Sequence, residues 1–444
     1  MTTPELSMTA TELPVLRPGD PQYAESARTL LGEGQPELVV RPRSVSEVSA
    51  AVLRAHEDDL AVTVRSGGHS MAGLSLATGG LLLDLRSMAE IEVDPPSRTV
   101  RIAGGATWGE VAAALRPHGL GITAGDTAGV GVGGLTLGGG IGWLVRRYGL
   151  AIDSLIGAQV VTAEGDILEV SAEAHPELFW SLRGGGAGSA VVTRFDFRAQ
   201  EITDVVFGSI VLDPADPAGL LTGWSEVQRE ADERLTTVFS LMPAMGDRPA
   251  VAMVQVCFDG PEADAQAAID ALLSLGPVLS SELDVRPYAE VLEEAHPPAG
   301  MRVAVTNTFL DLDTATATAL AQVYAAGGTV VSLRALGGAV ARVPVEDTAF
   351  AHRNAEAMVV ALRFLPGEPE PGEDLVPGWA AVAERGSGTY LNFSSVADES
   401  VLATAYPPAT RERLEQIWAE HDPAGRFGAP GAPADRRGLG PAAG

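Results

Sequence analysis

Short apolar runs alternate with amphipathic segments over the first half of the chain. Apolar runs that end at turn residues are typical of strands, whereas apolar side chains that recur every three or four positions are typical of helices. This pattern predicts strands over residues 37–41, 61–65, 80–85, 91–94, 98–104, 155–163, 167–170 and 190–198. It also predicts helices over 44–56 and 107–119, because Ser44 with Glu47 and Thr107 with Glu110 form capping-box patterns. The first half is therefore an α+β unit that ends near residue 200.

The pattern changes near residue 205, where the strands and helices become longer. Strands are predicted over 207–213 and 251–260, and helices over 217–232 and 261–275. This order indicates an antiparallel sheet with helices on one of its faces. Further along, the sequence predicts a strand over 390–395 and a helix over 409–422. The Pro-, Gly- and Ala-rich tail over 428–444 has no apolar period, and we expect it to be disordered.

Composition narrows the class of protein. With 444 residues, 46% of them apolar and 20% charged, the chain is an ordinary globular protein that is long enough for two domains with a shared cleft. All 30 basic residues are arginine, and 58 acidic residues give a net charge of −28. This charge argues against nucleic acids and anionic membrane surfaces as partners. No apolar stretch is long enough to span a membrane, and no secretion signal is recognised, so we expect a soluble cytoplasmic protein. The single cysteine, Cys257, excludes an internal disulfide.

The sharpest local signal is the segment Arg65-Ser66-Gly67-Gly68-His69-Ser70, which directly follows a predicted strand. Two glycines let backbone N–H groups turn inward as an anion-binding nest, which suits a pyrophosphate. The arginine and the two serines add a charge and hydroxyl donors. A histidine within such a turn is unusual. It either hydrogen-bonds to loop carbonyls or has a chemical role.

A second glycine-rich segment covers residues 125–150. Gly129, Gly131 and Gly134 satisfy the pattern G-x-G-x-x-G, and Asp153 follows them, as in a dinucleotide-binding Rossmann turn. No apolar strand precedes the pattern, however, and the glycines at 138–140 would disrupt a crossover helix. We therefore favour a length of bare backbone that can closely approach a flat ring or a diphosphate. Apolar residues interleaved with the glycines argue against a run of flexible turns.

In order along the chain, RSGGHS (65–70), the glycine segment, LFWSLRGGGAGSAVVTRFDF (178–197) and YLNF (390–393) resemble the berberine-bridge-enzyme-like oxidases. These oxidases belong to the vanillyl-alcohol-oxidase or PCMH-type flavoprotein superfamily. The resemblance covers residues 36–200 and 388–427, with a more variable middle. It implies an α+β fold with a two-subdomain FAD-binding domain and an antiparallel-sheet substrate domain. The expected divisions are an N-terminal extension (1–35), the FAD-binding domain (36–204), the substrate domain (205–387), a C-terminal segment that returns to the FAD domain (388–427) and the tail (428–444).

The resemblance also implies site residues. His69 would be covalently bonded to the 8α-methyl carbon of the flavin. Many relatives add a second bond from a cysteine, but Thr127 stands at that position here, so we expect a single bond and an inert, buried Cys257. The third motif departs from the usual G-G-G-G-N-F-G-V-V-T, although Val192 would still offer its backbone to the adenine. The cofactor-binding residues implied are Arg65, Ser66, Gly67, Gly68, His69, Ser70, Gly125, Asp126, Gly131, Gly134, Gly138, Gly139, Gly142, Val192 and Asn392.

Tyr390 and Asn392 share one face of the predicted strand. In relatives the tyrosine is the catalytic base and the asparagine contacts the cofactor. Because the unperturbed pKa of tyrosine is about 10, this role requires nearby groups that favour the phenolate, or proton loss that accompanies hydride departure. The alternative is a core tyrosine with a satisfied hydroxyl.

A second candidate pocket segment is the strand-like run over 337–353, which carries Arg342, His352 and Arg353. His352 is either a helper acid or base or a satisfied surface histidine, and the roles of His352 and Arg342 stay open. The other histidines, His175, His296 and His421 among them, show no metal-ligand spacing, and we expect no metal site.

These observations predict an FAD-dependent oxidase that transfers hydride from an alcohol, an amine or a natural-product scaffold to flavin N5. Dioxygen would then reoxidise the flavin and give hydrogen peroxide. The charge of −28 favours a neutral or cationic substrate. The alternatives are a flavin dehydrogenase with another acceptor, a flavin-bound non-redox cyclase or ligand-binding protein, and a nicotinamide-dependent Rossmann enzyme. The sequence leaves the substrate, the stereochemistry and the oligomeric state open.

Overall fold

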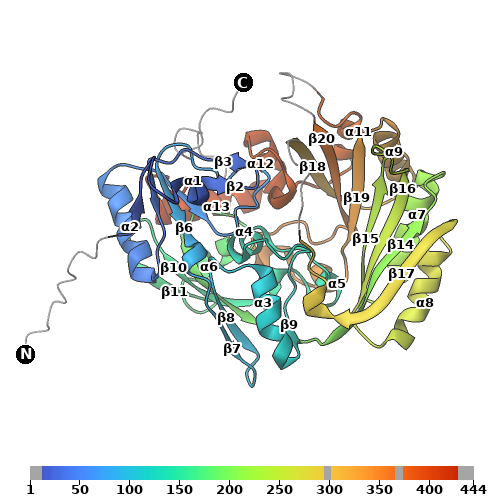
Figure 1. Cartoon of the computed structure of the whole chain (residues 1–444), viewed down its shortest axis with the longest axis horizontal. Coiled ribbons are helices and arrows are strands. Elements are labelled where there is room, and N and C mark those ends of the chain that lie inside the picture. The colour runs from blue at the N-terminus through green and yellow to red at the C-terminus, as the bar shows by residue number, and fades with distance from the viewer. Residues whose placement is uncertain (1–12, 295–301, 366–373, 429–444) are drawn as a thin grey trace, which may run out of the picture.

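The computed structural model describes residues 13–294, 302–365 and 374–428. Two halves lie side by side: the first carries the N-terminal strands and helices, and the second is built on one large sheet (Figure 1). The short helices α4 (Val132–Gly138) and α5 (Val145–Tyr148) lie where the halves meet. The tail after residue 428 and His296 lie outside the described residues.

The first sheet has four strands in the order β1 (Val15–Leu16), β4 (Leu38–Val40), β6 (Leu81–Asp84) and β5 (Val62–Arg65). β4 and β5 both pair with β6 in parallel, whereas β1 pairs with β4 antiparallel. The predicted helix is α2 (Val45–Glu57), and the Ser44 hydroxyl accepts a hydrogen bond from the backbone N–H of Glu47 at its N-terminus. The sequence analysis set residues 1–35 apart as an N-terminal extension. In the structure, the described part of this segment contributes β1 to the first sheet and also forms α1 (Tyr23–Ala27), β2 (Arg28–Thr29) and β3 (Gly32–Glu33).

The second sheet is antiparallel, in the order β11 (Ile167–Val170), β10 (Leu155–Val161), β12 (Val191–Arg198), β8 (Thr99–Ala103) and β7 (Ile91–Asp94). The helices α3 (Trp108–Leu115) and α6 (Pro176–Leu182) contribute to its core. In α3, Thr107 and Glu110 make both halves of the predicted capping box. A separate two-stranded ladder joins β9 (Leu120–Gly121) and β13 (Gln200–Glu201).

The third sheet has seven antiparallel strands, in the order β17 (Val278–Pro287), β14 (Asp204–Leu212), β16 (Val251–Phe258), β15 (Leu235–Met242), β19 (Thr329–Ala335), β20 (Ala357–Leu365) and β18 (Arg302–Leu310). One face packs on α7 (Pro217–Glu230), α8 (Glu262–Leu273), α9 (Thr314–Ala325) and α11 (Trp379–Ala383). Side chains alternate along each strand, so Phe239 packs toward the helices while Val238 packs against the first half of the chain. We call the helix-free side the inner face. The predicted α+β fold with an antiparallel-sheet half is confirmed.

The last helices, α12 (Glu399–Ala405) and α13 (Pro408–His421), return to the first half (Figure 1). Leu414 joins the core of the second sheet, and Arg413 forms an ion pair with Glu177 while lying over the ring of Trp180. The backbone N–H of Val62 in β5 donates to the carbonyl of Arg426. The C-terminal helices and the residues after them therefore complete the core of the first half of the chain.

The predicted strand over 390–395 is wrong, because residues Leu391–Phe393 form a short 3₁₀ helix. The reason lies in Asn307 on β18, whose side-chain amide donates to the carbonyls of Tyr390 and Phe393 and accepts from the N–H of Tyr390. One side chain thus satisfies the backbone groups that a neighbouring strand would otherwise bind. Tyr390 and Asn392 come together through this turn rather than through a shared strand face.

The prediction of a strand-like run within residues 337–353 is also wrong. It contains α10 (Ala339–Arg342) and the 3₁₀ turn Val345–Asp347, since Gly337 and Gly338 have positive φ angles and Pro344 lacks the N–H that a ladder needs. Arg353 at its end is completely buried and forms a bidentate ion pair with Asp153. Arg342, in contrast, forms an exposed ion pair with Glu233. Asp153 is thereby committed to the contact between the two halves of the chain.

We expect Arg353→Met to destabilise the protein strongly. The substitution leaves the carboxylate of Asp153 buried without its partner, which costs about 3–5 kcal/mol. The measurement is urea unfolding followed by fluorescence, and the matched control is Arg342→Met, which removes an exposed pair and leaves the midpoint nearly unchanged. Equal midpoints for the two variants would contradict a structural role of the buried pair.

Candidate active site

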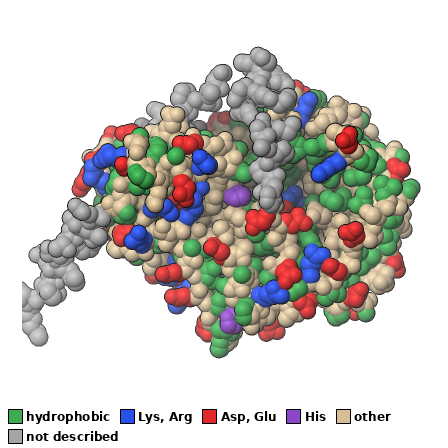
Figure 2. Space-filling view, in the orientation of Figure 1, with side chains coloured by type: hydrophobic (Ala, Val, Ile, Leu, Met, Phe, Trp, Pro, Cys, Tyr) green, Lys and Arg blue, Asp and Glu red, His purple; other side chains and the backbone are tan. Residues whose placement is uncertain are grey.

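A cavity of about 560 Å³ lies between the first half of the chain and the inner face of the seven-stranded sheet. Its lining comes from the 65–70 loop, the glycine segment, residues 184–192, the inner face and the YLNF motif. This volume falls within the range of about 300–1,000 Å³ that is usual for ligand and cofactor sites. On the face drawn in Figure 2, acidic and basic side chains are interspersed rather than gathered into one basic patch. Because the lining residues come from segments that lie far apart in the sequence, the fold brings these segments together around a single site.

Most of the predicted site residues line this cavity: Ser66, Gly67, Gly68, His69, Ser70, Gly125, Asp126, Gly131, Gly134, Gly138, Val192, Tyr390 and Asn392. Arg65, Gly139 and Gly142 do not contribute to the lining.

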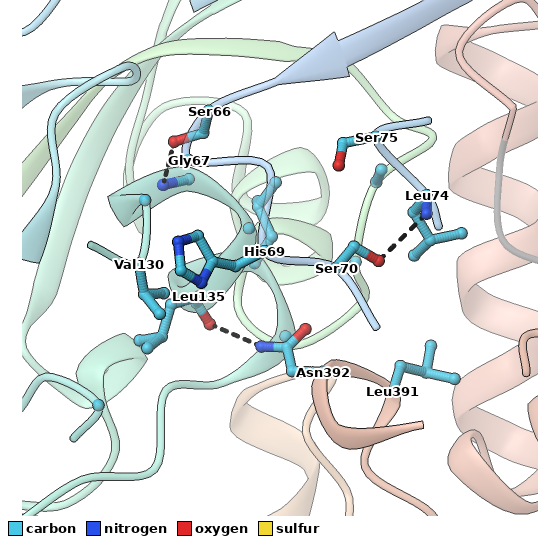
Figure 3. Close-up of a pocket in the computed structure, with 18 of the residues that line it drawn as sticks. Ser66, Gly67, His69, Ser70, Leu74, Ser75, Val130, Leu135, Leu391 and Asn392 are labelled. Carbon is cyan, nitrogen blue, oxygen red and sulfur yellow. Dashed lines mark hydrogen bonds between the residues drawn. The ribbon is translucent and has the colours of Figure 1, made fainter. Parts of the chain in front are cut away.

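The 65–70 loop packs on the glycine segment, backbone against backbone. A Cβ atom on Gly67 would lie 2.3 Å from the nitrogen of Gly131, and a Cβ on Gly131 would lie 2.1 Å from the nitrogen of Gly67. The hydroxyl of Ser66 donates to the carbonyl of Gly104 (2.7 Å) and accepts from the N–H of Gly133 (3.3 Å), and the dashed line at Ser66 in Figure 3 marks the second of these bonds. Both glycines are needed here because no side chain fits between the two segments.

The glycine segment contains a short helix that the sequence analysis did not predict. Gly131 is the N-cap of α4, which has seven residues and ends at Gly138 because Gly139 has a φ of +132°. The glycines therefore stop the helix early rather than prevent it. No atom lies within 4 Å of the position of a Cβ on Gly134. Bare backbone thus faces the cavity, as the sequence indicated.

His69 lies on the cavity wall and is half-buried (Figure 3). Burial and the charge of Arg65 lower the pKa of His69, although the carboxylate of Glu294 acts in the opposite direction. The imidazole is therefore mainly neutral at pH 7, and its ring nitrogens can act as nucleophiles.

Tyr390 is buried at the cavity wall with its ring stacked on Phe393. Its hydroxyl oxygen accepts hydrogen bonds from the N–H of Gly140 and from the side-chain amide of Asn392, both at 3.0 Å. Burial raises the pKa of Tyr390 to about 12, even though these donors and the charge of Arg334 favour the phenolate. Asn392 also donates to the carbonyl of Leu135 in α4, so it ties Tyr390 to the glycine segment.

Arg65 does not face the cavity, contrary to the prediction that it contributes to pyrophosphate binding. Its guanidinium lies behind the loop and donates to the carbonyls of Ser26 and Glu25 at the end of α1. The N-terminal residues placed outside the FAD domain thus provide acceptors for this buried cation, which attaches the loop to α1.

Gly139 and Gly142 support the cavity from behind. A Cβ on Gly139 would lie 2.9 Å from the ring of Phe350, and one on Gly142 would lie 1.2 Å from the carbonyl oxygen of Ala124. Their small size allows close packing of the glycine segment rather than contact with a ligand.

Asp126 lines the cavity, but its carboxylate is already engaged. Burial would raise the pKa of Asp126, yet the charge and the hydrogen bond of Arg334 outweigh it and hold that pKa below its usual range. Thr127 donates a further hydrogen bond to this carboxylate at 3.0 Å. Arg334 comes from β19 on the inner face and lies 4.6 Å from the centre of the Phe393 ring. The sequence analysis missed Arg334; its position in an alternating apolar and polar run (331–335) is the signal that could have found it.

His352 lines the cavity, whereas Cys257 lies outside it. His352 is buried, not on the surface: its Nε2 lies 3.1 Å from the carbonyl oxygen of Ala405, its ring stacks on Phe309 and burial lowers its pKa. Cys257 is completely buried in β16 and outside the cavity lining, and burial raises the pKa of its thiol.

Within the described ranges no group of His, Cys, Asp or Glu side chains could hold a metal ion. In the same residues no helix is long and apolar enough to span a membrane.

Asp153 is paired with Arg353 and is not available to bind a ribose, which argues against a Rossmann turn in the glycine segment. The family described as "FAD binding domain" matches residues 36–171. The (R)-6-hydroxynicotine oxidase of Paenarthrobacter nicotinovorans is 33% identical over 418 residues, which cover 88% of this chain and 90% of that protein. An uncharacterized FAD-linked oxidoreductase of Bacillus subtilis, YgaK, is 31% identical over 92% of this chain and 94% of its own length.

A solved structure shows the same fold. That of 6-hydroxy-D-nicotine oxidase from Arthrobacter nicotinovorans matches 95% of this chain and 98% of its own with a TM-score of 0.82 and 30% identity. The chain belongs to the berberine-bridge-enzyme-like, PCMH-type family of FAD-linked oxidoreductases.

We expect the thiol of Cys257 to be unreactive in the folded protein. Because burial raises its pKa and no solvent reaches it, a disulfide reagent at neutral pH should label almost none of the native chain. Unfolding in guanidinium should then expose one thiol per chain. Stoichiometric labelling of the native protein would contradict the buried position.

Proposed function

We propose that the chain is an FAD-dependent oxidase that acts on a small alcohol, amine or natural-product scaffold. Bound FAD would supply the hydride acceptor and the reaction with dioxygen that yields hydrogen peroxide. One observation carries the proposal: His69, the bare backbone of α4 and the Tyr390–Asn392 pair all line one cavity. An unpartnered buried hydroxyl, that of Ser75, also lines this cavity, and a glycine backbone without nearby atoms faces it, so the residues fit a large flat cofactor with a polar tail.

The proposed attachment of FAD is a single covalent bond through His69. A neutral imidazole, favoured by its lowered pKa, is the form whose ring nitrogen could bond to the 8α carbon. That methyl group would lose one hydrogen and the imidazole its N–H proton, and the two electrons released would pass to dioxygen to give hydrogen peroxide. Thr127 occupies the position where many relatives have the second linking cysteine, and its hydroxyl is bonded to Asp126. Cys257, buried in β16, is not part of the cavity lining. The other cofactor contacts are assigned to the lining residues of the loop, of α4 and of β12, including Val192.

Tyr390 is the proposed base that removes the substrate proton. Only its phenolate can accept a proton, and a pKa of about 12 makes the phenolate scarce at neutral pH. The hydrogen bonds from Gly140 and Asn392 stabilise that phenolate and aim the oxygen into the cavity. Proton removal therefore becomes faster as the pH rises.

The proposed substrate is neutral or cationic. The one arginine among the described lining residues, Arg334, is paired with Asp126, and Glu293 also lines the cavity. An anion would meet this excess of negative charge. The relatives named above include an oxidase of 6-hydroxynicotine, an amine, which supports this class.

We also propose residues 36–204 as the FAD domain, 205–387 as the substrate domain, and a cytoplasmic location.

The covalent bond is tested by acid precipitation of the purified protein. We expect a yellow pellet, and a peptide containing His69 whose mass is increased by one FAD. His69→Ala should release all its flavin into the supernatant, while Cys257→Ala should behave as the parent. A yellow supernatant from the parent protein would contradict the linkage, and a colourless protein would contradict flavin binding altogether.

The role of Tyr390 is tested by anaerobic flavin reduction with an accepted substrate. We expect the rate to rise about tenfold per pH unit below pH 10, since the phenolate fraction grows in that proportion. Tyr390→Phe should lower the rate by about 10²–10⁴-fold and abolish this slope. The matched control is Tyr288→Phe, a buried tyrosine whose hydroxyl donates to the carbonyl of Ile122 outside the cavity. A level pH profile in the parent, or an unchanged rate in Tyr390→Phe, would exclude the phenolate as the base.

A further inference from the structure

Three serine hydroxyls around the 65–70 loop line the cavity, but they are not equivalent (Figure 3). The hydroxyl of Ser66 has no proton left for a ligand, because it donates its one proton to the carbonyl of Gly104, and it also accepts from the N–H of Gly133. The hydroxyl of Ser70 accepts from the N–H of Leu74 at 3.1 Å, which leaves its own proton available as a donor.

Ser75 differs from both. Its side chain is only 8% exposed, and its hydroxyl oxygen is buried without any hydrogen-bond partner among the described residues. A buried hydroxyl that lacks a partner costs about 1–3 kcal/mol. Ser75 follows Leu74, the residue whose N–H holds Ser70, so both hydroxyls belong to one turn beside the loop. Ser75 contributes to the lining of the cavity, and its hydroxyl oxygen, which has almost no accessible surface, would reach a ligand there by rotation about the Cα–Cβ bond.

The charged side chains near these hydroxyls determine which hydrogen-bond donors an anionic ligand would meet. Arg65 does not line the cavity: its Nη1 donates to the carbonyls of Ser26 and Glu25, and its Nε is buried without a partner among the described residues. Arg334, the one arginine among the described lining residues, is paired with Asp126. Anionic oxygens at the loop therefore depend on neutral donors, namely backbone N–H groups and the serine hydroxyls, and each hydroxyl contributes a larger share of the binding.

We propose that Ser75, together with Ser70, donates hydrogen bonds to the diphosphate of FAD, and that Ser66 has only a structural role in the loop. This assignment rests on the proposed function, because it takes FAD as the ligand. It adds Ser75, which the sequence motifs did not select, to the cofactor-binding residues.

The test measures reversible flavin binding in a His69→Ala background, in which no covalent bond forms. FAD and riboflavin are titrated separately, because riboflavin carries the same ring without any phosphate. Ser75→Ala should weaken FAD binding by about 10–100-fold, the usual range for a lost hydrogen bond to a charged group, and leave riboflavin affinity unchanged. Ser75→Thr, which keeps a hydroxyl, should recover most of the FAD affinity.

Two further measurements separate a ligand contact from a structural one. Without flavin, Ser75→Ala should unfold at the same or a higher urea concentration than its parent, since it removes an unsatisfied buried hydroxyl. The control, Ser66→Ala, should lower the unfolding midpoint and weaken FAD and riboflavin by the same factor, because it disturbs the loop rather than a phosphate contact. Equal losses of both flavins in Ser75→Ala, or an unchanged FAD affinity, would overturn the assignment. Failure of the His69→Ala parent to bind either flavin would instead reject the proposed function, and the assignment with it.

Discussion

The contact between the backbones of Gly67 and Gly131 holds the site together. It places a loop from the parallel sheet against the beginning of α4 with no room for a side chain on either residue. Ser66 completes the contact by bonding to backbone groups on two other segments. Everything that lines the cavity on this side, His69 included, takes its position from this close approach. Glycine is required here for its lack of a Cβ, because neither residue has a left-handed backbone conformation.

The other side of the cavity is attached to this contact by buried polar groups. Asn392 joins the YLNF turn to α4, Arg334 joins the inner face to Asp126, and Arg353 joins the second half to Asp153. Arg146 in α5 is also buried and donates to the carbonyls of Gln228 and Leu235 in the second half. Because such groups are costly when their partners are lost, the two halves are held in one relative position. A site assembled from distant segments needs this rigidity to align a cofactor with a base.

Much of the fold could be predicted from sequence, because its strands and its longer helices have clear apolar periods. Ser44 and Thr107 marked real helix starts, and the order of four glycine and aromatic motifs indicated the correct family. The errors have a common cause: tertiary contacts replaced local preference. The amide of Asn307 turned the predicted strand at Tyr390 into a 3₁₀ helix, and glycines taken as helix breakers only ended α4. Arg65 matched a phosphate-binding motif but is directed to acceptors on α1, which no local pattern reveals. Ser75 had no signal in the sequence, since its distinction is the absence of a described partner in three dimensions.

The position of the last helices bears on how the protein matures. Leu414 and Ile417 fill the core of the first half, and β5, which leads into the 65–70 loop, is bonded to the backbone of Arg426. The core of the first half therefore stays incomplete until these residues have been synthesised. A chain truncated before α13 would lack part of this core and the backbone partner of β5, so the 65–70 loop that follows β5 would lose support from below.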